Sequence, residues 1–165
     1  MTQAVEAQAR PATNPLERLA SAMPENLALT ISVLARVAGA AALLYYAYDQ
    51  DTLFPERHFP RTWVFTGGIA ALALLSIVPM LRGATAGLMV MLASVGGGVL
   101  IFGGANLATR WPGVVAIVAG VVAWATYSAV FYTRTRKAEP VVAGLLLGSL
   151  ASYVLIGICV FLVSN

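Results

Sequence analysis

Long apolar runs alternate with short polar connectors along most of the chain. A transmembrane helix needs about 20 mostly apolar residues to cross the hydrocarbon core of a bilayer. Several runs reach that length, and proline, glycine, charged or interfacial aromatic residues bound them. The pattern predicts an all-α integral membrane protein with a bundle of five transmembrane helices, over residues 27–48, 62–81, 84–107, 114–132 and 141–163.

The polar segment before the first run divides into two parts. Residues 1–13 are rich in alanine and glutamine and have no periodicity, which is typical of a flexible tail. Residues 14–17 then combine an asparagine N-cap, a proline at the first helical position and a capping-box glutamate. We therefore expect residues 1–26 to form a cytoplasmic tail with a short interfacial helix, and residues 27–165 to form the transmembrane domain. Docking of the short helix on a partner protein is an alternative.

Only a very short polar link separates the second and third runs. Arg82 and Gly83 follow residues 62–81 directly, and Pro79 lies one turn before that end, where a lost helical hydrogen bond costs little. A single unbroken helix across both runs would be much longer than a bilayer requires. We therefore expect a tight reversal that makes a helical hairpin of the two spans.

Lysine and arginine are unequally divided between the two sides of this arrangement. Cytoplasmic connectors of membrane proteins carry an excess of these residues. The distribution predicts a multi-pass protein of the bacterial inner membrane with a cytoplasmic N-terminus and a periplasmic C-terminus. Six basic residues fall on the predicted cytoplasmic side (Arg10, Arg18, Arg82, Arg134, Arg136 and Lys137), and three fall on the other side (Arg57, Arg61 and Arg110).

The composition agrees with this class of protein. Hydrophobic residues make up 59% of the chain and charged residues only 10%, whereas soluble domains carry about a quarter charged residues. A formal net charge of +3 and a pI near 9.4 do not indicate nucleic-acid binding, because the basic residues are scattered between apolar runs.

Few residues in the chain are suited to catalysis. The single histidine, His58, lies in a connector, and the single cysteine, Cys159, lies deep in an apolar run. A metal cluster or a bis-histidine haem site cannot be assembled from these within one chain. We therefore expect no enzymatic activity, no cofactor and no metal site.

Glycines are concentrated in the third and fifth predicted spans. Small residues let helices approach closely within a bilayer, so we expect each of these two helices to be packed on both sides by neighbours. An alternative is that the triple glycine breaks its helix and lines an ion or substrate site, as in some transporters. The predicted packing residues are Gly83, Gly87, Gly96, Gly97 and Gly98 around the third span, and Gly144, Gly148 and Ser152 in the fifth.

The connector over residues 49–61 mixes charges of both signs with phenylalanines and prolines. Exposed aromatic residues beside arginine are typical of protein interfaces, and proline stiffens a loop. The alternative is an ordinary solvated connector whose phenylalanines dip into the headgroup layer. The candidate interaction residues in this outer loop are Phe54, Arg57, His58, Phe59 and Arg61.

Arg36 lies near the middle of the first predicted span. A charge at that depth costs roughly 2.5–3.5 kcal/mol on insertion scales, so it normally has a partner and a purpose. None of the acidic residues falls within a predicted span. Arg36 is therefore a candidate for binding a partner subunit or an anionic ligand or lipid. The alternative is that its side chain extends along the helix to the cytoplasmic headgroups.

These features predict a non-catalytic accessory or structural subunit that anchors or organises partners in a larger membrane complex through helix packing. The competing hypothesis is a small homo-oligomeric transporter or channel for an anionic or lipid-like substrate, which would use Arg36 and the glycine-rich third span. The expected partners are the lipid bilayer, other membrane subunits or further copies of the chain, and anionic lipid.

Overall fold

The structure is a computed structural model that describes residues 14–53, 60–82, 87–136 and 138–164. All regular elements in these ranges are helices, and the chain has no strand there. The helices are α1 (Pro15–Ala22), α2 (Glu25–Leu53), α3 (Pro60–Leu75), α4 (Ile77–Leu81), α5 (Gly87–Ala105), α6 (Trp111–Thr135) and α7 (Ala138–Ser164).

Four stretches of the described chain are long and apolar enough to cross a membrane, as in a multi-pass membrane protein. They are Glu25–Gln50, Thr62–Leu81, Trp111–Thr135 and Val142–Phe161. The predicted span over 84–107 corresponds to α5, whose described apolar stretch, Met91–Ala105, is shorter than these four. The structure is therefore an all-helical protein with four candidate membrane-spanning helices and a further apolar helix.

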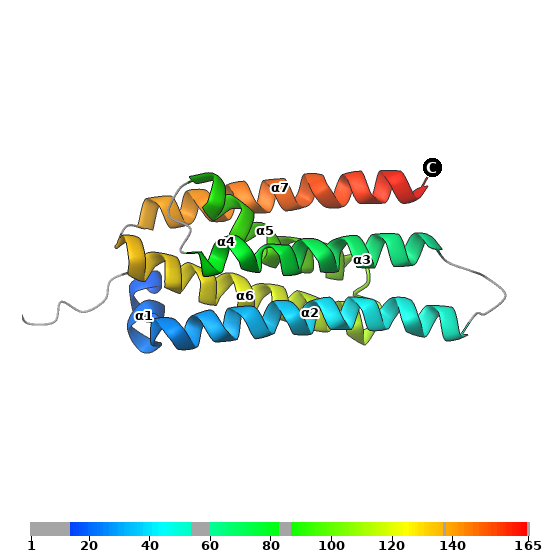
Figure 1. Cartoon of the computed structure of the whole chain (residues 1–165), viewed down its shortest axis with the longest axis horizontal. Coiled ribbons are helices and arrows are strands. Elements are labelled where there is room, and N and C mark those ends of the chain that lie inside the picture. The colour runs from blue at the N-terminus through cyan, green and yellow to red at the C-terminus, as the bar shows by residue number, and fades with distance from the viewer. Residues whose placement is uncertain (1–13, 54–59, 83–86, 137, 165) are drawn as a thin grey trace, which may run out of the picture.

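The long helices lie side by side along one axis, and α1 crosses their end (Figure 1). α5 packs against α3, α6 and α7, whereas α2 packs mainly against α6 and α3. α1, the start of α2 and the end of α6 lie at one end of the bundle, and the C-terminal end of α7 lies at the other (Figure 1). This arrangement places α5 between three neighbours.

The predicted span over 62–81 is interrupted at Ser76, which separates α3 from α4. Pro79 explains the break, because a proline has no N–H to donate to the carbonyl four residues earlier and its ring crowds that carbonyl. In this span the carbonyl is that of Leu75, the last residue of α3. The interruption predicted at Pro79 is confined to Ser76, whose backbone stays right-handed helical (φ −65°, ψ −14°) and whose N–H still donates to the carbonyl of Leu72 (3.1 Å).

The connector between α6 and α7 is shorter than the predicted connector over 133–140. α6 continues to Thr135, and Arg136 adopts the left-handed conformation (φ 56°) while its N–H donates to the carbonyl of Tyr132. α7 already begins at Ala138, which leaves Pro140 in its first turn. A proline is tolerated there because first-turn N–H groups have no partner within the helix.

Candidate functional site

Arg36 of α2 is completely enclosed by the bundle, with 0% of its surface exposed. Its Nε donates to Ser76 Oγ (3.1 Å), and its Nη2 donates to the carbonyl of Ala93 in α5 (2.9 Å). Its Nη1 donates to the carbonyl of Ser32 (3.1 Å) and to the hydroxyl of the same residue. The guanidinium therefore joins α2 to the α3/α4 junction and to α5.

The guanidinium also lies against an aromatic ring. The guanidinium carbon of Arg36 lies 5.8 Å from the centroid of the Tyr127 ring on α6, within the range of a cation–π contact. The Tyr127 hydroxyl is buried and has no hydrogen-bond partner among the described residues. Every hydrogen-bond acceptor of Arg36 in the described chain is neutral, so dipoles and a ring face balance its charge rather than a carboxylate.

The break at Ser76 positions the hydroxyl that Arg36 contacts. Ser76 lies between the two helices, is buried, and donates its own hydroxyl hydrogen to the carbonyl of Ala73 (2.6 Å). Its oxygen thus accepts from Arg36 while its hydrogen is used locally. Sequence reasoning identified Arg36 and Pro79 separately and did not connect them, because their contact depends on how two distant helices pack.

Gly96 provides the space in which Arg36 and Ser76 meet. A Cβ at this position would overlap Ser76 Oγ and approach Arg36 Nε to 2.9 Å. Gly96, which the sequence predicts as a helix-packing residue, therefore also lies directly against the Arg36 side chain. The alternative in which the triple glycine breaks its helix is not what the structure contains, because α5 continues through Gly96, Gly97 and Gly98.

The other small residues of α5 lie against two different helices. Facing α6, a Cβ on Gly97 would lie 3.0 Å from the carbonyl oxygen of Gly120. Facing α7, a Cβ on Gly98 would lie 2.8 Å from Ser152 Cβ, and a Cβ on Gly148 would lie 2.5 Å from Ser94 Cβ. Small residues therefore line both sides of α5, as predicted. The same prediction is wrong for α7 within the described residues, because Gly148 faces α5 whereas Leu146, Leu150 and Gly157 lie on an open face.

The remaining predicted site residues are less fully described. Gly144 is buried on α7, and Gly87 is the first residue of α5. Arg61 belongs to the first turn of α3, but its side chain is not described. Five predicted residues lie outside the described residues: Gly83, Phe54, Arg57, His58 and Phe59.

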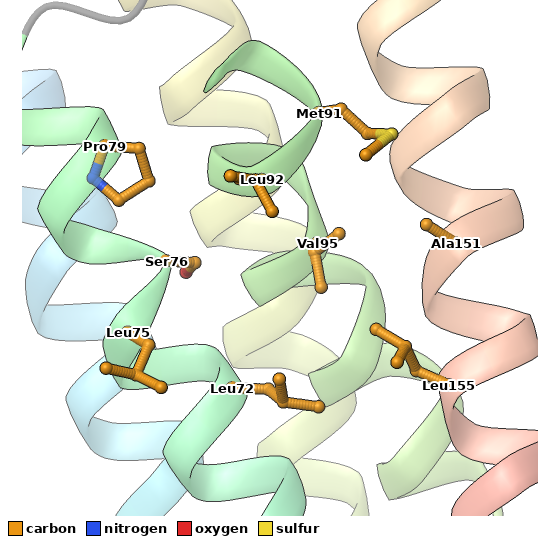
Figure 2. A pocket seen from close by; sticks show the side chains of 9 residues that line it. All are labelled: Leu72, Leu75, Ser76, Pro79, Met91, Leu92, Val95, Ala151 and Leu155. Carbon is orange, nitrogen blue, oxygen red and sulfur yellow. The ribbon is translucent and has the colours of Figure 1, made fainter. Parts of the chain in front are cut away.

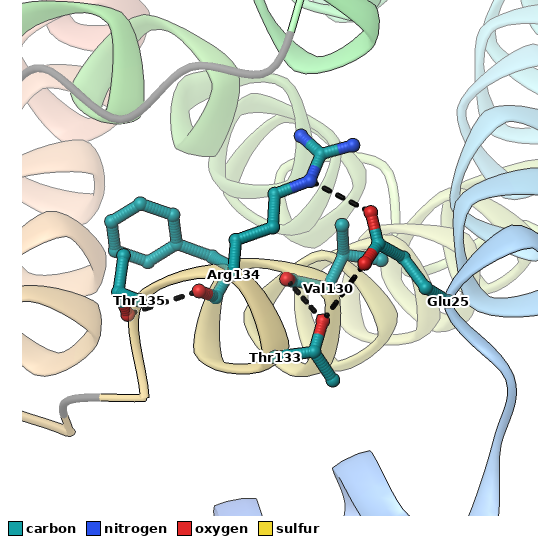
Figure 3. Close-up of polar contacts among 6 residues, drawn as sticks. Glu25, Val130, Thr133, Arg134 and Thr135 are labelled. Carbon is teal, nitrogen blue, oxygen red and sulfur yellow. Dashed lines mark hydrogen bonds and ion pairs between the residues drawn. The ribbon is translucent and has the colours of Figure 1, made fainter.

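A polar cluster joins three helices at the end of the bundle where α1 lies. Arg134 Nε at the end of α6 forms an ion pair with Glu25 Oε1 at the start of α2 (2.8 Å), and the Thr133 hydroxyl donates to Glu25 Oε2 (3.3 Å; Figure 3). The Tyr132 hydroxyl donates to Glu17 of α1 (2.7 Å). Sequence reasoning missed this cluster, because it treated Arg134 as a topology signal and Glu17 as a capping residue.

An apolar groove lies between the α3/α4 pair, α5 and α7 (Figure 2). Its volume is about 320 Å³, within the roughly 300–1,000 Å³ of small-molecule pockets. Ser76 lies on its wall, so the hydroxyl that contacts Arg36 separates the guanidinium from the groove. The apolar lining includes Leu72, Leu75, Pro79, Leu92, Ala151 and Leu155. Sequence reasoning gave no indication of this groove.

Within the described residues, no three histidine, cysteine, aspartate or glutamate side chains come together. Cys159 is partly buried on α7 and packs against the apolar core.

The chain matches no protein family, no curated protein and no solved structure.

Proposed function

We propose that the chain is a non-catalytic subunit that crosses the bacterial inner membrane five times and anchors or organises partner subunits. In this proposal α5 is the fifth span, because it is apolar and lies beside the four longer candidate spans. The bundle itself is the functional unit, and its contribution is to hold other membrane proteins in place rather than to carry out a reaction.

The distribution of basic residues supports the proposed orientation. Arg82 ends α4, and Arg134 and Arg136 end α6, toward the end of the bundle that carries α1 (Figure 1). Arg110 precedes α6 at the opposite end. Since positive charge accumulates on the cytoplasmic side, α1 would lie in the cytoplasm and the C-terminus in the periplasm.

The enclosure of Arg36 is the observation that carries the proposal. A substrate-binding or catalytic arginine needs donors that face a ligand, whereas this guanidinium directs its hydrogen bonds to groups on its own chain. The hydrogen bonds of the buried guanidinium thus link α2, the α3/α4 junction and α5. Such links suit a rigid scaffold, in which the outer surface of the bundle recognises the partners.

The outer face of α7 is the best candidate for that recognition. Only 24% of its span is buried, the smallest share among the four candidate spans. Four large side chains with an exposure of 62–67% follow one another at intervals of three to eight residues, which places them along one face of the helix: Leu146, Leu150, Tyr153 and Phe161. Gly157 falls in the same stripe and has open space around it among the described residues, so a partner helix can approach there.

Purification in mild detergent followed by mass spectrometry tests this function. The proposal predicts foreign membrane subunits in stoichiometric amounts, which Leu150→Trp on α7 should displace. Leu34→Trp on α2 is the matched control, because Leu34 has nearly the same exposure (61%, against 62% for Leu150) on a different helix. A preparation that contains only this chain, as a monomer or a ring, would contradict the proposal.

The transport hypothesis remains the second candidate, and the groove beside Ser76 is the observation that favours it. An anionic or lipid-like molecule in the groove would lie one hydroxyl group away from Arg36. The packing of Gly96, Gly97 and Gly98 against neighbouring helices weighs against a pore along α5. Flux of a labelled anionic lipid in proteoliposomes, abolished by Arg36→Leu, would support transport over the accessory role.

A further inference from the structure

The groove between α3/α4, α5 and α7 is hydrophobic along its whole length except for one side chain. Ser76 supplies the only hydroxyl among its described lining residues, and that hydroxyl is already used by Arg36 and by the carbonyl of Ala73. The groove therefore presents no polar group that needs a partner. A hydrocarbon occupant suits these walls, whereas water does not.

The groove opens on the outside of the bundle. Its rim includes Leu75 and Leu92, which are 65% and 43% exposed; Leu75 belongs to a candidate membrane span and Leu92 to the shorter apolar helix α5. Unfilled apolar volume leaves the lining atoms without contacts, so the surrounding solvent tends to fill it. In a bilayer that solvent is the acyl chain of a lipid.

A cation lies beyond one end of the groove. Figure 2 shows Pro79 and Met91 at one end of the groove and Leu72 and Leu155 at the other. Arg82 ends the same short helix that contains Pro79, about 4.5 Å further along the axis, and it is exposed. An occupant that extends past Pro79 therefore meets a positive charge.

From this geometry we infer that the groove binds one acyl chain of an anionic phospholipid, with the lipid phosphate held by Arg82. The chain lies between Leu72 and Pro79, and the phosphate lies at the end of the bundle that carries α1. A guanidinium pairs strongly with phosphate oxygens, and a basic residue near a membrane surface favours anionic over neutral lipids. This lipid site is separate from the α7 face proposed for partners and does not depend on the accessory function.

Binding of added lipid to the purified, delipidated protein tests this inference, with native mass spectrometry as the readout. The probes are phosphatidylglycerol and phosphatidylcholine with identical acyl chains. The wild type should retain one phosphatidylglycerol more strongly than phosphatidylcholine. Arg82→Gln should lower that preference about fivefold, because a basic residue near the surface contributes this much to anionic lipid binding. Arg110→Gln, at the opposite end of the bundle, is the charge-matched control and should leave the preference unchanged.

A second variant tests the groove itself. Ala151→Phe puts an aromatic ring into the groove from α7 and should reduce retention of both lipids at least tenfold. Ala41→Phe, at an exposed position on α2, is the matched control and should retain both. Thermal unfolding of each variant separates loss of the site from loss of the fold, and Arg82→Gln tests the site without any change to the core.

Retention by Ala151→Phe equal to wild type, or an unchanged preference in Arg82→Gln, would overturn the inference. Loss of a foreign protein from Ala151→Phe with no change in bound lipid would assign the groove to a partner and overturn it equally.

Discussion

The Nε of Arg36 donates a hydrogen bond of 3.1 Å to the Oγ of Ser76, 40 residues further along the chain. The contact exists because Pro79 ends α3 at Leu75 and leaves Ser76 at the junction with α4. Gly96 of α5 provides the space for both side chains. A proline, a glycine and an arginine on three different helices thus make one buried site.

The first prediction concerns the close approach at Gly96. Gly96→Ala should destabilise the protein by about 1–3 kcal/mol, because the added methyl group overlaps Ser76 Oγ. Unfolding in mixed micelles with increasing SDS measures this change. Ser76→Ala in the same chain should recover part of the loss, since it removes the overlapping oxygen but leaves Ser76 Cβ only 2.7 Å away.

Gly68→Ala on α3 is the control for this measurement. A Cβ at Gly68 would meet no described atom within 4 Å, so the change should be neutral or slightly stabilising through helix propensity. Equal destabilisation by Gly96→Ala and Gly68→Ala would mean that the Arg36 site is not packed as described.

The second prediction concerns the chemistry of residue 36. Arg36→Lys should unfold more easily than the wild type by roughly 1.5–3 kcal/mol, the usual contribution of a hydrogen bond to a charged group. A lysine ammonium cannot reach the acceptors on α2, at the α3/α4 junction and on α5 that the planar guanidinium contacts together. Arg36→Leu should be less damaging than Arg36→Lys, because it removes the buried charge as well as its bonds. An Arg36→Lys variant as stable as the wild type would mean that the hydrogen bonds of the guanidinium do not stabilise the packing of these helices.

The third prediction concerns the contact between α5 and α7. Gly148→Leu should force the two helices apart and lower both yield and stability, because even a Cβ there comes within 2.5 Å of Ser94 Cβ. Gly157→Leu on the open side of α7 is the matched control and should fold normally. Wild-type stability in both variants, measured by the same SDS titration, would mean that α7 does not pack on α5 through this face.

The fourth prediction is the topology. With the N-terminus in the cytoplasm, a reporter fused at Ala138 should also be cytoplasmic, and one fused after Asn165 should be periplasmic. Paired alkaline phosphatase and green fluorescent protein fusions distinguish the two sides. The reverse result at both positions would mean that α5 does not cross the membrane.

Part of this structure was predictable from the chain alone, because the apolar runs and their breaks are local signals. The helical class, the candidate spans other than α5 and the unusual position of Arg36 all follow from such signals. The partners of Arg36 do not, since Ser76 and Ala93 are 40 and 57 residues away and no periodicity relates them. For the same reason, the sequence does not show that Gly96 makes room for the Arg36 side chain as well as for a neighbouring helix.

The interruption near Pro79 is a local signal, but its link to Arg36 is not. Pro79 indicates a weak point one turn before the end of the span, whereas the contact between the Ser76 hydroxyl and Arg36 depends on how α2 packs there. The ion pair between Glu25 and Arg134 joins residues 109 positions apart, so each charge was interpreted alone. Tertiary packing determines both features.

The central claim is that Arg36 serves the interior of the chain while the outer face of α7 serves its partners. The most direct test compares the companions that copurify with Arg36→Leu and with Leu150→Trp, for preparations with equal amounts of folded protein. The account predicts that Arg36→Leu keeps its companions at wild-type stoichiometry and that Leu150→Trp loses them. Folded Arg36→Leu protein that has lost its companions, beside Leu150→Trp protein that keeps them, would contradict the claim.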